Sequence, residues 1–343
     1  MQISAFDYQL PKYLIAQEPS VERQASRMLV VNRTAKTLQD DNFTAFPDRL
    51  GAGDVLVLNN TKVFPARIFG RIETGANVEI FLVDKISDSS WEAMARPARR
   101  LRKGKIIDFG STLRGKVATE PTEGRVIVDF DFEGEFEEIL SRIGRTPLPP
   151  YIKRDAGAID EDRARYQTVY AKSSGAIAAP TAGLHFTSEV LDNIDAKGVE
   201  VAEITLHVGY GTFEPVRAVD LTEHSVLPER YEINEATAGI LNAARDERRR
   251  IIAVGTTTTR ALETAVARDG KFLAGPALAD LTIIPGYRFR AVDALLTNFH
   301  LPQSSLLILV STFSGHELIM DAYRHAVTEE YRFYSYGDCM FIE

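Results

Sequence analysis

The chain has 343 residues, of which 45% are hydrophobic and 26% charged, an ordinary composition for a globular protein. No apolar run is long enough to span a bilayer, and the N-terminal sequence lacks the basic and apolar segments of a secretory signal. The single cysteine, Cys339, excludes an intramolecular disulfide and a multi-cysteine zinc site, and together these features indicate the cytoplasm. The formal net charge of −8 argues weakly against nucleic-acid binding, although the charges are unevenly distributed.

The first half of the chain predicts one buried strand followed by a β-rich insertion. Residues 54–60 (DVLVLNN) are typical of a buried strand. From residue 67 to about 144, short runs of β-branched and aromatic residues alternate with Gly, Asp, Ser and Pro, which predicts a small closed barrel. A short helix is expected over 135–142, and the prolines of residues 145–152 (RTPLPPYI) predict an extended linker.

From about residue 166 onward, predicted helices and strands alternate. Thr187 or Ser188 is expected to cap one helix and Asn234 another. Three apolar runs are predicted as strands and one amphipathic run as a helix: strands 199–208, 251–255 and 306–311, and helix 316–330. We therefore predict an α/β domain formed from both chain ends, residues 1–66 and 152–343, with an inserted small antiparallel β-barrel domain and its linker at 67–151.

The predicted barrel carries the densest basic stretch of the chain. Residues 96–105 (RPARRLRKGK) contain no acidic residue and six basic ones, Arg96, Arg99, Arg100, Arg102, Lys103 and Lys105. The stretch is either a solvated loop or a surface that contacts phosphates.

Two segments lead into predicted helix starts and are candidate ligand-binding sites. Residues 178–187 (AAPTAGLHFT) are rich in small residues, and include Thr181 and His185; the alternative is a tight turn with a structural histidine. Residues 254–263 (VGTTTTRALE) place hydroxyl groups, backbone N–H groups and one cation where an anion can bind, at Thr256, Thr257 and Arg260. Simple helix capping explains the second segment equally well.

Three further segments hold polar or aromatic residues beside predicted strands. Residues 206–213 (LHVGYGTF) contain a Gly-x-Gly pair and an aromatic residue, at Gly209, Gly211 and Phe213. Residues 295–305 contain Asn298 and His300, and residues 331–340 contain Tyr336 and Asp338. The aromatic C-terminal segment can stack on bases or hold a cation, or it is a strand packed on the sheet.

The sequence offers no motif for metal binding or for a serine nucleophile. None of the six histidines forms a His-Glu-x-x-His or comparable local pair, and no Gly-x-Ser-x-Gly segment occurs. We therefore predict no metal. Cys339 is expected to be a buried, inert thiol, because its nearest basic neighbour is Arg332.

In combination, these segments resemble one family, the S-adenosylmethionine:tRNA ribosyltransferase-isomerases. The resemblance runs from FDYQLPKYLIAQEP near the N-terminus to YRFYSYGDCM near the C-terminus, through RTPLPPYI, RYQTVYA, AAPTAGLHFT, LHVGYGTF and LLTNFHLP. It implies an α/β domain with an inserted β-barrel, S-adenosylmethionine consumed as co-substrate without a prosthetic group, and tRNA carrying 7-aminomethyl-7-deazaguanine at the wobble position as the partner. The implied reaction moves and isomerises the ribosyl group, giving epoxyqueuosine and releasing adenine and methionine.

The implied chemistry needs a base near the sulfonium, an acid for the departing adenine and a pocket for a cation. His185, His300 and Asp338 are the predicted catalytic residues. The predicted substrate-binding residues are Thr181, Gly209, Gly211, Phe213, Glu229, Thr256, Thr257, Arg260, Asn298 and Tyr336. The sequence departs from the family pattern at Asn60 and Lys62, where Asp and Arg are usual, and at Leu227 and Pro228, where His and Ser are usual.

Two other functional classes remain open from the sequence. One is a hydrolase or sugar-transferring enzyme for free nucleosides, with an anion site at Thr256–Arg260; the basic stretch argues against it. The other is a non-catalytic RNA-binding scaffold; polar clusters at separate strand ends argue against that, since ligands gather at such ends.

Overall fold

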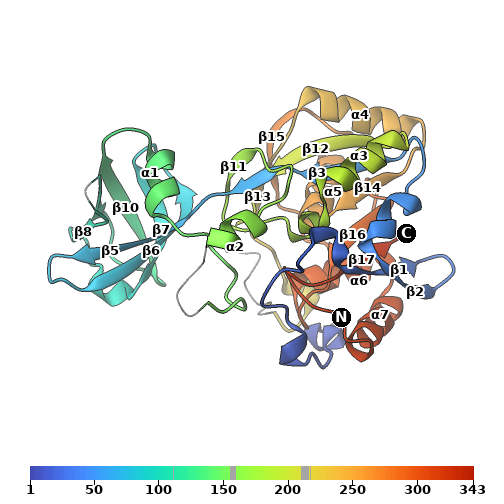
Figure 1. Ribbon diagram of the computed structural model, residues 1–343, viewed down its shortest axis with the longest axis horizontal. Coiled ribbons are helices and arrows are strands. Elements are labelled where there is room, and N and C mark those ends of the chain that lie inside the picture. The colour runs from blue at the N-terminus through green and yellow to red at the C-terminus, as the bar shows by residue number, and fades with distance from the viewer. Residues whose placement is uncertain (111, 155–159, 210–215, 217) are drawn as a thin grey trace.

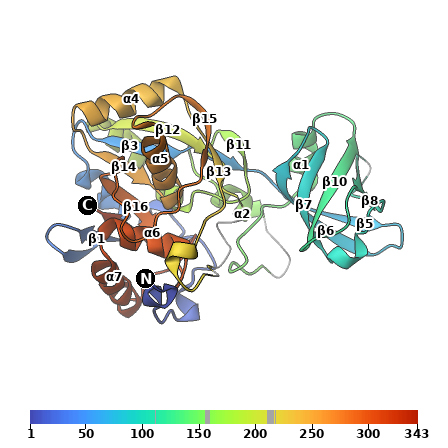
Figure 2. The same cartoon turned by 180° about the vertical axis from the view of Figure 1, so that it is seen from behind.

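The computed structural model describes residues 1–110, 112–154, 160–209, 216 and 218–343. A large α/β domain and a small β-barrel lie side by side and are joined by two chain segments (Figures 1 and 2). Both ends of the chain contribute strands to the α/β domain, and the barrel is inserted between them. The predicted fold class is thereby confirmed.

The core of the α/β domain is a nine-stranded mixed sheet with the order β15-β13-β12-β3-β14-β16-β17-β1-β2. Its strands are β1 (Arg27–Asn32), β2 (Thr37–Asn42), β3 (Val55–Asn59), β12 (Glu200–Leu206), β13 (Glu229–Ile233), β14 (Ile251–Val254), β15 (Gly275–Ala279), β16 (Ala294–Asn298) and β17 (Cys339–Ile342). Strands β12, β3, β14 and β16 are mutually parallel, so their carboxyl ends meet at one edge of the sheet. Ligands of open α/β sheets bind at this edge.

Helical segments cover both faces of the sheet because its buried strands alternate with a period of two. Val55 and Val57 of β3 face one core, whereas Leu56 and Leu58 face the other. The first core includes residues of α4 (Glu235–Asp246), α5 (Thr256–Asp269), α6 (Ser305–Ser314) and α7 (His316–Thr328). The second includes residues of η4 (Phe43–Arg49), η6 (Thr181–His185) and α3 (Ser188–Ala196).

The inserted domain is a closed six-stranded antiparallel barrel with the order β10-β7-β6-β5-β8-β9. Its strands are β5 (Arg67–Ile72), β6 (Asn77–Lys85), β7 (Ser90–Arg96), β8 (Ile106–Asp108), β9 (Leu113–Val117) and β10 (Arg125–Phe132). Helix α1 (Phe136–Ile143) packs its apolar face against the barrel core. Residues 67–132 therefore form a core that is separate from the two cores of the sheet.

A short two-stranded ladder lies where the barrel joins the α/β domain. Strand β4 (Thr61–Val63) pairs in parallel with β11 (Ser173–Ala176). The remaining elements are short: η1 (Ile3–Phe6), η2 (Lys12–Leu14), η3 (Arg23–Ala25), η5 (Ala98–Arg100), α2 (Asp160–Arg165) and η8 (Leu221–Glu223).

Both predicted helix caps are confirmed. The Thr187 hydroxyl accepts a hydrogen bond from the Val190 N–H at 3.2 Å, which begins α3. The Asn234 carboxamide accepts one from the Thr237 N–H at 2.8 Å, which begins α4. These side chains satisfy donors that the helices leave free at their first turn.

The predicted strand at residues 306–311 is wrong, because this run lies within helix α6. The Ser304 hydroxyl accepts a hydrogen bond from the Leu307 N–H and starts the helix. Leu307, Ile308 and Val310 are all fully buried, so the helix is apolar around most of its circumference. A short apolar run of this kind has no periodicity that separates a buried strand from a buried helix.

Cys339 lies fully buried on β17, and burial raises the pKa of its thiol well above the ordinary value. The prediction of an unreactive thiol agrees with this environment. In the part of the chain that the structure describes, no helix has the length and apolar character required to cross a bilayer.

Candidate functional site

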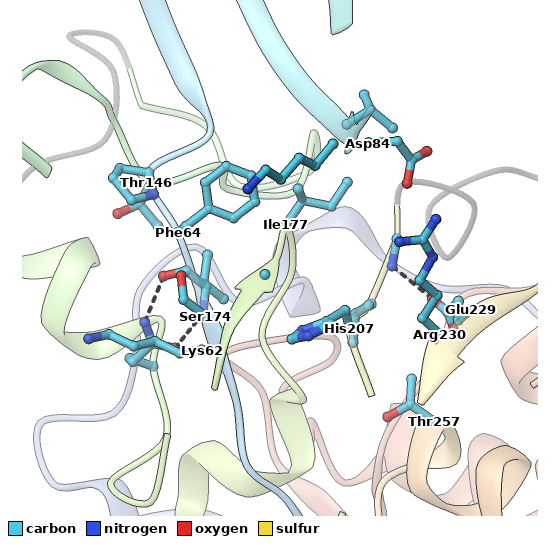
Figure 3. A pocket seen from close by; sticks show the side chains of 18 of the residues that line it. Lys62, Phe64, Asp84, Thr146, Ser174, Ile177, His207, Glu229, Arg230 and Thr257 are labelled. Carbon is cyan, nitrogen blue, oxygen red and sulfur yellow. Dashed lines mark hydrogen bonds between the residues drawn. The ribbon is translucent and has the colours of Figure 1, made fainter. Parts of the chain in front are cut away.

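A large cavity of about 1570 Å³ lies between the barrel and the α/β domain. The barrel contributes Val83, Trp91 and Phe132 to its lining, and α1 contributes Phe136. The α/β domain contributes residues that follow the carboxyl ends of β3, β12 and β14, and Figure 3 shows several of them, including Lys62, His207 and Thr257. The cavity therefore lies at the sheet edge where the parallel strands end.

A smaller pocket of about 70 Å³ adjoins the large cavity. Val208, Thr256, Thr257 and Leu306 line both. The small pocket also contains residues from four of the sequence segments singled out above: Thr181, Thr257, Asn298, His300 and Ser335. Segments far apart in the sequence thus converge on one small space, as binding residues at a sheet edge are expected to do.

The N-terminus of α5 opens between the two cavities. Among the described contacts, the hydroxyls of Thr256 and Thr257 have no hydrogen-bond partner, and no side chain caps the helix. The next two threonines differ, because Thr258 and Thr259 donate to carbonyls one turn back, at 2.7 and 3.1 Å. Free N–H groups, two hydroxyls and the positive end of a 14-residue helix therefore face the cavity, which is a favourable environment for an anion.

Arg260, predicted to bind an anion, is already paired with a carboxylate. Its Nη2 lies 2.7 Å from Oε2 of Glu229 and also donates to the carbonyls of Leu227 and Ala279, both at 3.1 Å. The other Glu229 oxygen accepts the Gly209 N–H at 2.9 Å. Gly209, Glu229 and Arg260 are three of the predicted substrate-binding residues, and all of them line the large cavity. Hydrogen bonds to Glu229 connect them into one group.

His300 lines the small pocket and is held by two hydroxyl groups. Its Nδ1 lies 3.2 Å from the Tyr323 hydroxyl and its Nε2 lies 3.3 Å from that of Thr297. Burial lowers the pKa of His300 to about 3, so its imidazole is neutral at pH 7.

His185 faces away from both cavities, into a narrow space of about 20 Å³. Its Nδ1 lies 2.8 Å from the Ser26 hydroxyl, and its Nε2 lies 3.4 Å from Oδ1 of Asn298. Burial lowers the pKa of His185 to about 4. Its contact with the small pocket passes through Asn298, whose amide N–H₂ donates to the Tyr334 carbonyl at 2.9 Å.

Asp338 and Tyr336 lie in the interior beside β17. The Asp338 carboxylate accepts the backbone N–H groups of Arg27, at 2.9 Å, and Arg332, at 2.7 Å. Burial raises its pKa, and those two hydrogen bonds oppose the rise. Tyr336 donates to Asp162 at 3.3 Å and lines the narrow space beside His185. Neither residue lines the large cavity or the small pocket, and the predicted roles of both stay predictions.

Two predicted substrate-binding residues, Gly211 and Phe213, lie outside the described residues. The six basic residues of the barrel stretch are described: Arg96, Arg99, Arg100, Arg102 and Lys103 are exposed, and Lys105 is half-buried. The stretch follows β7, whose first residues, Ser90 and Trp91, lie toward the cavity end of the strand. Arg96 is five residues beyond Trp91, about 17 Å along an extended strand.

The main residue that sequence reasoning missed is His207. It follows β12 directly, lines the large cavity, and places Nδ1 2.8 Å from the Thr61 hydroxyl. The sequence of residues 206–213 directed the prediction to its glycines. The position of His207 near the end of a predicted strand is the signal that indicates a residue at the sheet edge. The sequence did not predict three other residues of the cavity lining, Lys62, Ser174 and Arg230 (Figure 3). They come from different strands, which meet only in the folded chain.

The four departures from the family pattern lie in or beside this site. Asn60 donates to Glu203 at 3.0 Å and accepts from the Thr205 hydroxyl at 2.7 Å, so it links β3 to β12. Lys62, Leu227 and Pro228 line the large cavity, and Leu227 offers its backbone carbonyl to Arg260.

Residues 3–342 match the model of a protein family described as queuosine biosynthesis protein. The chain belongs to this family. Among queuosine biosynthesis relatives, the S-adenosylmethionine:tRNA ribosyltransferase-isomerase of Syntrophotalea carbinolica is 49% identical over all of both chains. That of Symbiobacterium thermophilum is 48% identical, again with complete coverage of both.

The crystal structure of the S-adenosylmethionine tRNA ribosyltransferase of Thermotoga maritima is similar to this protein. It shares 35% identity and a TM-score of 0.57, and the match covers 99% of this chain and 100% of the other. The family resemblance inferred from the sequence motifs is confirmed, and the protein is an enzyme of the transferase-isomerase class.

Proposed function

We propose that this enzyme transfers and isomerises the ribosyl group of S-adenosylmethionine onto 7-aminomethyl-7-deazaguanine at the wobble position of tRNA. The products are epoxyqueuosine-tRNA, adenine and methionine. The observation that carries the proposal is the size and position of the large cavity. At about 1570 Å³ it exceeds the roughly 300–1,000 Å³ typical of small-molecule sites. It therefore has room for a small cosubstrate together with a nucleotide extruded from an RNA loop.

The methionine carboxylate of S-adenosylmethionine is assigned to the N-terminus of α5. Thr256 and Thr257 supply hydroxyls that have no partner among the described residues, and the first turn supplies N–H groups that no described side chain caps. Arg260 contributes indirectly, because it neutralises and orients Glu229.

Glu229 is the proposed acceptor for the N1 and N2 edge of the deazaguanine. Among the described residues that line the large cavity, it is the buried carboxylate, whereas Asp84, Asp88, Glu135, Glu137 and Glu138 are exposed. A buried acceptor discriminates strongly against a base that cannot donate to it.

His300 is the proposed hydrogen-bond partner of the departing adenine, since its neutral imidazole lies on the small pocket next to the anion site. In the same proposal His185 is a positioning residue that holds the Asn298 amide. Thr181 and Asn298 contact ligand at the small pocket. Asp338 and Tyr336 support this wall from behind, by ordering the segment around Ser335.

The exposed basic stretch from Arg96 to Lys105 is the proposed contact for tRNA phosphates. Residues 67–132, strands and loops together, carry 12 basic and 10 acidic residues, so the barrel is the less acidic part of a chain whose net charge is −8. Phosphate contacts on the barrel would hold the RNA while one nucleotide reaches the cavity. A reaction on tRNA also places the enzyme in the cytoplasm.

Adenine release tests the proposal. The protein is incubated with S-adenosylmethionine alone, with tRNA carrying 7-aminomethyl-7-deazaguanine, and with tRNA carrying guanine at the same position, and adenine is measured by liquid chromatography. We expect release only with the modified tRNA. Release without RNA would indicate an enzyme of free nucleosides, and tRNA binding without any release would indicate an RNA-binding scaffold.

A further inference from the structure

His207 is held in one orientation at the wall of the large cavity. Asn59, the last residue of β3, fixes the end of β12: its amide N–H₂ donates to the Leu206 carbonyl and its oxygen accepts the Leu206 N–H, each at 2.9 Å. The Thr61 hydroxyl then meets Nδ1 of His207 at 2.8 Å. Asn59 and Thr61 are both fully buried, so the position of the ring is set from the interior.

The face of the imidazole lies against Gly175 of β11. A Cβ atom at this position would lie 2.8 Å from Cε1, 2.9 Å from Nδ1 and 3.0 Å from Nε2 of the ring, too close for any real side chain. Gly175 also has a φ of +147°, which L side chains rarely adopt. The absence of a side chain at residue 175 thus leaves space for the His207 ring.

The hydrogen bonds of Thr61 are compatible with a proton on Nδ1 of His207. When its hydroxyl donates to the Ser173 carbonyl, 3.5 Å away, its oxygen accepts from the ring, and this is the tautomer that we assign. Nε2 then has a lone pair, and no described residue donates a hydrogen bond to it. Figure 3 shows the ring between Lys62 and Ser174 on one side and Glu229 and Arg230 on the other.

The surroundings of the ring favour its neutral form. Burial, and secondarily Arg230, lower the pKa of His207, while Glu232 opposes them. Arg230 and Glu232 lie on β13, as does Glu229; β4 presents Thr61 to the ring and carries Lys62 on the same cavity wall, and β11 presents Gly175. The two buried histidines, His185 and His300, have both ring nitrogens within hydrogen-bond distance of a protein group, and the half-buried His224 has its Nε2 occupied by Ser305 at 2.9 Å.

We infer that Nε2 of His207 is the general base that takes the proton from the carbon next to the sulfonium of S-adenosylmethionine, with Thr61 as its positioning residue. The inference rests on the proposed function. In this step the C–H bond breaks, its electron pair stays on the carbon beside the positive sulfur, and the proton moves to Nε2. The imidazolium keeps its Nδ1–H bond to Thr61, and it becomes neutral again when its proton is passed to the departing adenine.

The activity arm of the test compares H207Q, T61V and T61S with H325Q, a matched histidine replacement at the protein surface. Adenine release with the modified tRNA should fall about 100-fold or more in H207Q. It should fall less in T61V and recover in T61S, while H325Q stays at the wild-type rate. Wild-type turnover should decline as the pH falls through the pKa of His207, below about 6.5, and the residual rate of H207Q should lack this decline.

The second arm needs no turnover. Nitrogen-15 NMR of histidine-labelled wild-type protein at pH 7.5, assigned with H207Q, should show His207 with its proton on Nδ1, and T61V should change that signal. A proton on Nε2, or an H207Q variant within about threefold of wild type with the same acid limb, would overturn the inference. A wild-type protein that releases no adenine with modified tRNA would instead refute the proposed function, and this inference with it.

Discussion

The carboxylate of Glu229 and the guanidinium of Arg260 form a buried ion pair, with Oε2 and Nη2 2.7 Å apart. The pair joins β13 to α5 beside the large cavity, and the two side chains are only 6% and 13% exposed. Because Arg260 lies near the start of a helix, the sequence predicts that it binds an anion of the substrate. In the folded protein, Glu229 already neutralises its charge.

Loss of one partner of this pair should therefore reduce stability. Arg260→Ala leaves the Glu229 carboxylate buried without its cation, and the free energy of unfolding should fall by about 3–5 kcal/mol. Urea denaturation measures the change. Arg102→Ala is the control, because Arg102 and its partner Glu120 are both largely exposed and their separation is 3.5 Å; the expected change there is at most about 1 kcal/mol. An Arg260→Ala protein of wild-type stability would argue that Arg260 contacts ligand directly.

The anion site at α5 predicts a specific loss of affinity for S-adenosylmethionine. Thr257→Val removes a hydroxyl that faces both cavities and keeps the shape of the side chain. Equilibrium dialysis should show binding weakened by about 0.5–1.5 kcal/mol, or roughly two- to tenfold. Thr264→Val on the same helix removes a hydroxyl that donates to the Arg260 carbonyl, and it should leave affinity unchanged. Equal affinity in both variants would assign the helix start to a structural role.

The buried histidines predict a loss of stability in mild acid. The folded-state pKa of His185, about 4, lies below the ordinary value of about 6.5, so between these values the unfolded chain binds more protons. Stability is complete above pH 6.5 and falls as the pH drops toward 4, by up to about 1.4 kcal/mol per pH unit for each such group.

Urea midpoints between pH 4 and 7 test this effect with His185→Gln, in which the decline should become shallower. A residual slope should remain from His300, whose pKa is lowered to about 3. His325→Gln is the control, since it replaces a histidine whose side chain is partly exposed. An undiminished slope in His185→Gln would show that His185 is not buried as a neutral group.

The barrel stretch predicts an effect on RNA that spares the small substrate. Replacing Arg99, Arg100 and Arg102 with Ala should weaken tRNA binding and flatten its dependence on salt, by up to about one unit of log–log slope per lost phosphate contact. Affinity for S-adenosylmethionine should stay unchanged, because the stretch does not line either cavity. Filter binding at several salt concentrations measures the slope. Wild-type tRNA affinity with an unchanged slope would place the RNA surface elsewhere.

Local signals in the sequence predicted helix caps well, because the caps at Thr187 and Asn234 depend on contacts within three residues. Residues 306–311 were mistaken for a strand, because burial on all sides removes the periodicity that separates the two structures. The order of the motifs along the chain was sufficient to predict the fold class and the family, because several segments matched the same family in the same order.

The site was harder to predict, because a side chain's direction depends on partners far away in the sequence. Nothing in the segment around His185 reveals that Ser26 occupies one of its ring nitrogens, 159 residues away. The sequence around Asp338 likewise does not show that its carboxylate accepts the backbone N–H of Arg27, 311 residues away. Thr61 of β4 and Gly175 of β11 set the orientation of His207, which follows β12. These three segments meet only in the folded chain.

The position of β17 has a consequence for the order in which this chain folds during synthesis. The strand formed by Cys339–Ile342 lies between β16 and β1, so β1 and β2 cannot join the rest of the sheet until residues after 338 have left the ribosome. The barrel, in contrast, has all its strands by Phe132. A nascent chain would thus carry a finished barrel beside an incomplete sheet, with the buried thiol of Cys339 sealed only at the last stage. Since this is the chain's single cysteine, its reaction with a thiol reagent directly times the closure of the sheet.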